Sequence, residues 1–245
     1  MRRDWDKRAR KNAFHYIASW RKEWDLESFL ASGEDDVERL VVPVLSRRGV
    51  ATAGKRMLEL GCGAGRMTRS FARRFEQVYA VDLSREMLSR ARQIHRGETN
   101  ILWMLCNGAD LACVASDSMD FVFSYLMLQH LPEETFALHY VSEMLRVLRP
   151  GCTFLFQFNG GFAPTMNWRG RLAWGTADAL WSAGLGALSR AMASVIGLDP
   201  ALVGKSWRGT SVAPSAIVER VRASGSEVRE ISGANTPMAW CCGVK

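Results

Sequence analysis

The chain has 245 residues and is 48% hydrophobic, so it can bury one substantial core, and we expect a single domain over residues 1–245. Its six cysteines lack metal-ligand spacing, which excludes a zinc site, and the longest apolar run, within 177–196, has only eleven uncharged residues between its charged positions, too few to cross a bilayer. The net charge of +7 is concentrated in residues 1–22, which hold eight basic residues and two acids; a solvated helix face explains this better than a surface for RNA or acidic lipid.

Residues 1–50 predict a helical N-terminal arm. The first helix carries an apolar stripe at steps of three or four residues, formed by Trp5, Ala9, Ala13, Ile17, Trp20 and Trp24. A second helix is expected after Asp35 and Asp36, because acids suit a helix N-terminus. We expect it to kink at Pro43 and to end at Gly49.

From residue 57 onward, apolar strands alternate with amphipathic helices. We expect strands at 57–60, 78–82, 101–106, 120–125 and 153–158, and helices at 65–75, 84–96 and 132–148. This alternation predicts an α/β fold, a doubly wound and mostly parallel sheet with helices on both faces. Ligands of such sheets bind at the carboxyl ends of the strands, where the strand order reverses.

A glycine-rich turn joins the first of these strands to its helix. It reads Glu59-Leu60-Gly61-Cys62-Gly63-Ala64-Gly65. The glycines remove side chains from the bend, so the backbone can approach a ligand and offer it free amides. A tight turn that binds nothing is the alternative.

The second strand ends in an acid, Asp82, nineteen positions after Gly63. An acid about 20 residues past a glycine turn lies at the tip of the adjacent strand, where its oxygens can accept hydrogen bonds from a ribose diol. The alternative is a helix-capping role shared with Ser84.

Four stretches in this order resemble the class I S-adenosylmethionine-dependent methyltransferases of the small-molecule type. They are the glycine turn at 59–65, Val81-Asp82-Leu83-Ser84 with Met87-Leu88, Asp120-Phe121-Val122-Phe123-Ser124 with Leu128-Gln129-His130-Leu131, and Glu143-Met144-Leu145-Arg146-Val147-Leu148-Arg149-Pro150-Gly151. The form of the glycine turn and the later Arg-Val-Leu-Arg-Pro-Gly turn separate this family from dinucleotide dehydrogenases.

The resemblance implies S-adenosyl-L-methionine as cofactor, with S-adenosyl-L-homocysteine as product. Glu59 and the glycine turn would hold the amino acid end, Asp82 the ribose, and Asn107 with Gly108 the adenine. The full set of implied cofactor-binding residues is Glu59, Gly61, Cys62, Gly63, Gly65, Asp82, Leu83, Met87, Asn107, Gly108, Asp110, Ser124, Tyr125 and Gln129.

Two positions of this set are open to a second interpretation. Relatives usually carry an acid where this chain has Asn107, although an amide oxygen can still accept a hydrogen bond from the adenine amino group. Asp110 is either a further adenine ligand or an acid that stabilises the turn.

His130 is the candidate catalytic base, because it lies nearest the carboxyl end of a strand among the four histidines. A structural histidine is the alternative. Tyr16 and Trp20 of the arm either touch ligand or only pack.

Residues 159–207 form a predicted helical insertion after the fifth strand, with a helix opened by Thr176 and closed by Gly197. We interpret the insertion as a lid over an acceptor with apolar surface; a dimer contact or an extension of the core is the alternative. Helix 214–223 and strands 227–232 and 237–244 follow. The family resemblance implies that these strands complete a seven-stranded sheet with an antiparallel last strand.

The predicted activity is methyl transfer to a small molecule by in-line displacement. An RNA or protein methyltransferase and a non-catalytic cofactor-binding module are the alternatives. Nucleic acid is not the expected partner, no transmembrane segment is expected, and either a monomer or a homodimer fits. Free thiols suit the cytoplasm.

Overall fold

The computed structural model describes residues 1–161, 176, 179–180, 183–185, 188–189, 191–192 and 210–245. Most of the predicted insertion at 159–207, including most of its helix, lies outside the described residues, so the lid stays a prediction.

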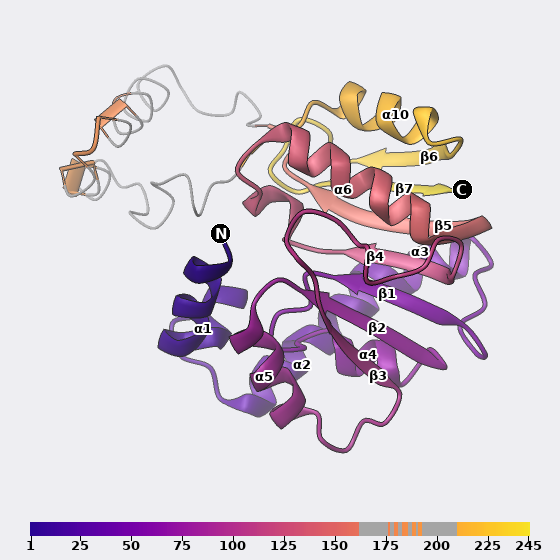
Figure 1. The fold of residues 1–245 in the computed structure, drawn as a ribbon, viewed down its shortest axis with the longest axis horizontal. Coiled ribbons are helices and arrows are strands. Elements are labelled where there is room, and N and C mark those ends of the chain that lie inside the picture. The colour runs from indigo at the N-terminus through magenta and orange to yellow at the C-terminus, as the bar shows by residue number, and fades with distance from the viewer. Residues whose placement is uncertain (162–175, 177–178, 181–182, 186–187, 190, 193–209) are drawn as a thin grey trace.

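Seven strands form one sheet in the described part of the chain (Figure 1). They are β1 (Arg56–Leu60), β2 (Gln77–Asp82), β3 (Ile101–Leu105), β4 (Met119–Ser124), β5 (Leu148–Phe158), β6 (Glu227–Ser232) and β7 (Ala239–Val244). The order is β3-β2-β1-β4-β5-β7-β6, and β7 runs antiparallel to both of its neighbours. The strand order reverses between β1 and β4, and the predicted fold class is confirmed.

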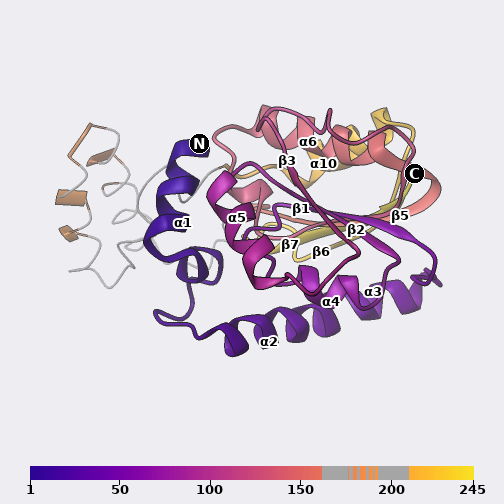
Figure 2. The ribbon, with the colours of Figure 1, turned by 60° about the horizontal axis from the view of Figure 1, so that its bottom comes forward.

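Helices cover both faces of this sheet. Those before the last two strands are α1 (Arg2–Ile17), α2 (Leu26–Asp36), the π-helical turn η1 (Val37–Val41), α3 (Val42–Arg47), α4 (Thr68–Ala72), α5 (Arg85–Ile94), the 3-10 turn η2 (Leu128–His130), α6 (Glu134–Val147) and α10 (Pro214–Ala223). Figure 2 shows α2, α3 and α4 on one side of the sheet and α6 with α10 on the other. Each face is therefore a helix–sheet core.

The central strand β4 contributes to both cores because its side chains alternate between the two faces. Phe121 and Phe123 pack among residues of α3 and α4, and Val122 packs against α6. All six residues of β4 are buried. A strand buried on both faces has no polar stripe, which explains the apolar run Phe121-Val122-Phe123 in the middle of this strand.

The N-terminal arm differs from the prediction in where its helices begin and end. Helix α1 stops at Ile17, so Trp20 and Trp24 lie beyond it. Helix α2 starts after Asp25, whose carboxylate accepts a hydrogen bond from the Ser28 amide at 2.8 Å. The expected start after Asp35 and Asp36 is wrong, because Asp25 already caps this helix.

The helix break near Pro43 lies before the proline. The π-helical turn η1 occupies Val37–Val41, and Pro43 sits in the first turn of α3. A proline in a first turn leaves no helical hydrogen bond unmade, and the wider turn before it relieves the clash of its ring with the preceding backbone.

Two further elements have different bounds from those predicted. The regular part of the helix expected at 65–75 is only Thr68–Ala72. Strand β5 begins at Leu148 instead of 153, so Pro150 and Gly151 lie within it. The Gly151 amide donates to the Lys245 carbonyl at 2.6 Å. This hydrogen bond holds the proline–glycine bend against Lys245, and Gly151 has a φ of +77°.

Gly33 brings α2 against the glycine turn. A Cβ on this residue would overlap the backbone carbonyl of Arg66, so no side chain fits there. We expect Gly33→Ala to lower the free energy of unfolding by about 2 kcal/mol or more, since the backbone at the contact must shift. Gly97→Ala is the control, because its Cβ would have nothing within 4 Å. Equal denaturant midpoints for the two variants would contradict the close packing of α2.

Candidate active site

A cavity of about 450 Å³ opens at the carboxyl ends of β1, β2 and β4. This is the edge at which the strand order reverses. Ten of the residues predicted for the site line it: Glu59, Gly61, Cys62, Gly63, Asp82, Leu83, Met87, Tyr125, Gln129 and His130. Tyr16 and Trp20 of the arm also line the cavity. Residues as far apart in the sequence as Tyr16 and Met238 therefore share one pocket.

The glycine turn takes the left-handed backbone that its sequence allows, with φ of +82° at Gly61 and +56° at Gly63. A Cβ on Gly61 would lie 2.6 Å from the Met127 side chain. The amides of Gly61 and Cys62 both donate to the Val81 carbonyl, at 2.8 and 3.1 Å. The expectation that this turn offers free amides is thus wrong for these two residues, because the neighbouring strand β2 uses them.

Asp82 joins the turn to the next helix. Its Oδ2 accepts the Gly63 amide at 2.9 Å, and its Oδ1 accepts the Ser84 amide at 2.8 Å. Burial is the largest influence on this carboxyl and raises its pKa, while these backbone hydrogen bonds oppose the rise. The Ser84 hydroxyl itself caps α5 by accepting the Met87 amide. Each carboxylate oxygen has a second lone pair, so Asp82 can still accept from a ligand.

Glu59 is buried in the cavity wall. Burial raises the pKa of its carboxyl to about 8, and the charge of Asp82 adds to the rise. The Thr68 hydroxyl donates to Oε2 at 2.5 Å and, with the charge of Arg66, partly offsets this effect. Glu59 is therefore uncharged near neutral pH in this state, and a cation bound beside it would ionise it.

The loop after β4 crosses the floor of the cavity in a strained backbone, with φ of +55° at Leu126. Gln157 holds this loop from the buried strand β5. Its Oε1 accepts the Leu126 amide at 3.1 Å, and its Nε2 donates to Gln129 Oε1 at 3.2 Å. Because that oxygen faces Gln157, the amide nitrogen of Gln129 remains a donor for a ligand. Sequence reasoning missed Gln157, although a glutamine in the aromatic run of β5 was a signal.

His130 lies at the end of η2 and lines the cavity. Its ring packs edge-on against the ring of Trp5, with 5.3 Å between centroids. Trp5 belongs to α1, so the arm fixes one side of the candidate base. The structure thus places His130 in the wall of the cavity, next to the arm.

Five predicted residues do not line the cavity: Gly65, Asn107, Gly108, Asp110 and Ser124. The Ser124 hydroxyl donates to the Leu60 carbonyl at 3.0 Å and ties β4 to β1. Gly65 faces inward, where a Cβ would lie 2.5 Å from His95 Nε2. These two positions serve the packing behind the glycine turn.

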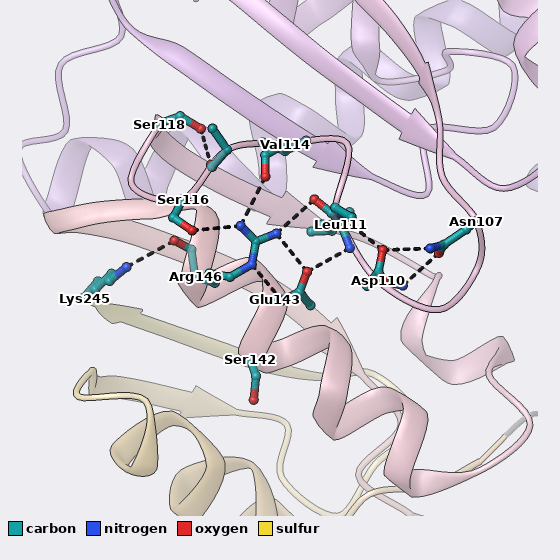
Figure 3. Close-up of polar contacts among 12 residues, drawn as sticks. Asn107, Asp110, Leu111, Val114, Ser116, Ser118, Ser142, Glu143, Arg146 and Lys245 are labelled. Atoms are coloured by element: carbon teal, nitrogen blue, oxygen red, sulfur yellow. Dashed lines mark hydrogen bonds and ion pairs between the residues drawn. The ribbon is translucent and has the colours of Figure 1, made fainter.

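Asn107 and Asp110 form a polar turn after β3 (Figure 3). Asn107 Oδ1 accepts the amides of Ala109 and Asp110, and its Nδ2 donates to Asp110 Oδ1 at 2.8 Å. The turn is held from α6 by Glu143, which accepts the Leu111 amide at 2.9 Å. In this state, Asp110 has the turn-stabilising contacts that were one of its two interpretations.

Helix α1 docks across the tips of β2 and β3. The Arg2 guanidinium donates to the carbonyls of Leu83 and Cys106 at 3.0 and 2.7 Å. The Ser84 hydroxyl donates to the Asp6 carboxylate at 2.6 Å, and Arg10 pairs with Glu86 at 2.9 Å. Some basic residues of the arm therefore bind the rest of the protein. The predicted solvated helix face did not include these contacts.

Two further features concern ions and membranes. The described residues contain no group of three or more His, Cys, Asp or Glu side chains placed to hold a metal ion. Among the helices that the structure describes, none has the length and apolar character needed to cross a bilayer.

Residues 58–156 match the family described as "Methyltransferase domain". Ubiquinone biosynthesis O-methyltransferase of Xanthomonas oryzae pv. oryzae is 36% identical over 101 residues, which are 40% of this chain and 41% of that protein. The protein of the same name from Hahella chejuensis is 30% identical over 135 residues, or 54% of each chain. The alignments thus span about half or less of these relatives.

Solved structures share the fold. The magnesium protoporphyrin IX methyltransferase of Synechocystis PCC 6803 with bound SAH has a TM-score of 0.63 and 17% identity, covering 100% of this chain and 97% of that chain. An S-adenosylmethionine dependent methyltransferase from Mesorhizobium loti has a TM-score of 0.55 and 20% identity, covering 83% and 96%. Together with the sheet order and the glycine turn, these structures show that the chain has the fold of S-adenosylmethionine-dependent methyltransferases, and residues 58–156 are similar to a methyltransferase domain.

Proposed function

We propose that this protein transfers a methyl group from S-adenosyl-L-methionine to a small-molecule acceptor with apolar surface. The observation that carries the proposal is the single cavity in which Glu59, Asp82 and His130 converge beneath the arm. S-adenosylmethionine is the cofactor of the methyltransferases that share this fold. When bound, it supplies an activated methyl group on a sulfonium, so the protein need only orient the acceptor and exclude water.

The residues of the cavity fit this cofactor. Asp82 has lone pairs for the ribose hydroxyls, and Leu83 and Met87 supply apolar surface beside it. Glu59 and the glycine turn lie where the amino acid end would bind. Of the predicted adenine residues, Asn107 and Gly108 do not line the cavity, so in this proposal adenine binds beside them, near Cys106.

The acceptor would occupy the part of the cavity between the arm and the loop after β4. Trp5, Leu131 and Met238 line this part with apolar surface. His130 is the proposed base for an acceptor whose nucleophile carries a proton. The names of the matching relatives, O-methyltransferases of ubiquinone biosynthesis, favour an oxygen nucleophile.

The contacts of the arm favour this proposal over an RNA methyltransferase. Arg2 is directed at the carbonyls of β2 and β3, and Arg10 is paired with Glu86. Because these two cations bind groups of the protein itself, they do not contribute to a positively charged surface for phosphates. The proposed location is the cytoplasm, because all six cysteines are free thiols. Either a monomer or a homodimer fits the proposal.

Thermal unfolding with S-adenosylhomocysteine tests the proposal. At about a hundredfold excess over its Kd, the ligand should stabilise the protein by about 2.7 kcal/mol, which raises Tm by roughly 5–10 °C for a domain of this size. NADH is the control and should leave Tm unchanged. A rise with NADH alone, or no rise with S-adenosylhomocysteine, would refute the cofactor assignment. Methyl transfer to small phenols, followed with labelled cofactor, then separates an enzyme from a binding module.

A further inference from the structure

Gln157, near the end of β5, carries a fully buried amide behind the wall of the cavity. Its side chain is 0% exposed and does not itself line the pocket. A buried amide needs partners for its oxygen and its nitrogen, because an unmade hydrogen bond is costly in the interior. The groups around Gln157 therefore decide which way its amide is oriented.

Two backbone groups fix this orientation. Gln157 Oε1 accepts the Leu126 amide at 3.1 Å, and Nε2 donates to the Pro237 carbonyl at 2.8 Å. A backbone N–H only donates and a backbone C=O only accepts. Turning the Gln157 amide over would therefore place donor against donor and acceptor against acceptor. The exchange of oxygen and nitrogen that is open to many glutamine side chains is thus closed to Gln157.

Gln157 in turn fixes the orientation of Gln129. The nitrogen of Gln157 has two hydrogens, of which one goes to Pro237 and the other to Gln129 Oε1 at 3.2 Å. Because the Gln129 oxygen is held against Gln157, the Gln129 nitrogen is directed away from this contact. Gln129 lines the cavity, and among the described residues its Nε2 makes no hydrogen bond. The cavity wall therefore presents a donor, and not an acceptor, at Gln129.

The position of Gln129 is on the acceptor side of the cavity. Gln157 joins it to Pro237, and the next residue, Met238, lines the proposed acceptor part. Asp82, the proposed ribose ligand, ends β2, and both β1 and β4 lie between β2 and β5 in the sheet. The donor of Gln129 is thus placed to meet the acceptor molecule.

We infer that Gln129 selects an acceptor molecule with a carbonyl or ether oxygen beside its methylated group, and that Gln157 is the positioning residue that sets this preference. The inference rests on the proposed function. A molecule with a carbon in place of that oxygen leaves the Gln129 donor unpaired and loses affinity. The family resemblance assigned Gln129 to the cofactor, whereas this inference assigns it to the acceptor.

The test compares phenols that differ in this oxygen. The compounds 2- and 3-methoxyphenol have an ether oxygen where 2- and 3-ethylphenol have a methylene group. NMR titration of the protein saturated with S-adenosylhomocysteine gives the ratio of the ethylphenol Kd to the methoxyphenol Kd. Gln129→Met removes the donor and keeps the length of the side chain. At the ring position beside Gln129, we expect this variant to lower the ratio by about threefold to tenfold, as for one neutral hydrogen bond.

Gln157→Glu tests the positioning role without changing a residue that lines the cavity. The introduced acid, protonated because it is buried, has one hydrogen where the amide has two, and the Pro237 carbonyl takes it. A lone pair then faces Gln129, whose amide turns its nitrogen to the acid and its oxygen to the cavity. An ether oxygen would now meet an oxygen. The ratio should therefore fall further than in Gln129→Met.

Thr153→Val is the matched control. Thr153 is also a buried polar residue of β5, but it does not line the cavity. Both Kd values should stay within about twofold of those of the unmodified protein. The Tm of each variant without ligand shows whether it folds, and Gln129→Met keeps the test decisive if Gln157→Glu does not.

Three results would overturn the inference. An unchanged ratio in Gln129→Met would show that its donor meets no oxygen of the acceptor. Equal losses for both phenols in Gln157→Glu would leave Gln157 with a structural role only. If neither series of phenols bound while S-adenosylhomocysteine did, the inferred class of acceptor would be wrong. Failure of S-adenosylhomocysteine itself to bind would instead refute the proposed function, and the inference would fall with it.

Discussion

Asp82→Ala is expected to weaken the binding of S-adenosylhomocysteine by about a hundredfold or more. A hydrogen bond to a charged group contributes about 1.5–3 kcal/mol, and the proposed ribose site has two of them. The variant also releases the amides of Gly63 and Ser84, which Asp82 holds at 2.9 and 2.8 Å. The glycine turn then loses one of its anchors as well as its ligand contact. Calorimetric titration with S-adenosylhomocysteine measures the loss.

Asp110→Ala is the matched control for this variant. Like Asp82, Asp110 accepts a backbone amide, that of Ala112 at 3.0 Å, but it does not line the cavity. We expect its affinity to stay within about threefold of the unmodified protein, since only the turn after β3 loosens. A large loss in Asp110→Ala would instead favour a direct adenine contact. Unchanged binding in Asp82→Ala would remove the ribose site from the proposal.

Phe123→Ala should cause the largest loss of stability among single core substitutions of this sheet face. Phe123 is fully buried in β4, and its ring lies 5.1 Å from that of Phe71 and 6.2 Å from that of Trp240. Truncation leaves a cavity between α4 and the sheet. Such changes cost about 3–5 kcal/mol, which lowers Tm by roughly 6–20 °C for a chain of this size.

Phe136→Ala removes the same atoms from an exposed position. Phe136 lies in α6 and is 39% exposed. Its loss should change the free energy of unfolding by about 0.5 kcal/mol or less. Calorimetric unfolding of the two variants measures the difference directly. A Phe123→Ala variant as stable as Phe136→Ala would mean that this face of the core repacks without a cavity.

The sheet could be predicted from the sequence because its signals are local. Strands β1, β2 and β4 are short apolar runs that end at a glycine, an acid and a serine, and each was expected within two residues of its observed bounds. The antiparallel last strand followed from the family resemblance. Pro150 and Gly151 misled the assignment of β5, because their turn preference is local while their pairing partner, Lys245, is about ninety residues away.

The candidate site likewise has one part that could be predicted from the sequence and one part that could not. The glycine turn and Asp82 could be found because their roles depend on spacing along the chain. Arg66, Gln157 and Arg2 were missed because their roles depend on partners 31 to 104 positions away. A single sequence contains no record of such pairs. The role of Asn107 in adenine binding was uncertain for a related reason. Its side-chain oxygen accepts two backbone amides of its own turn.

In the proposed function, the docking of α1 predicts an order of binding and release. Arg2 spans the tips of β2 and β3, and in the proposed site these tips form the entrance for the adenosyl group. A docked arm would block exchange of that group, so we expect the cofactor to enter before the acceptor and spent cofactor to leave only after the arm detaches. Because Trp5 of the same helix packs on His130, the arm that closes the entrance also completes the acceptor side. Release of the arm, and not the methyl transfer itself, would then set the rate of the cycle.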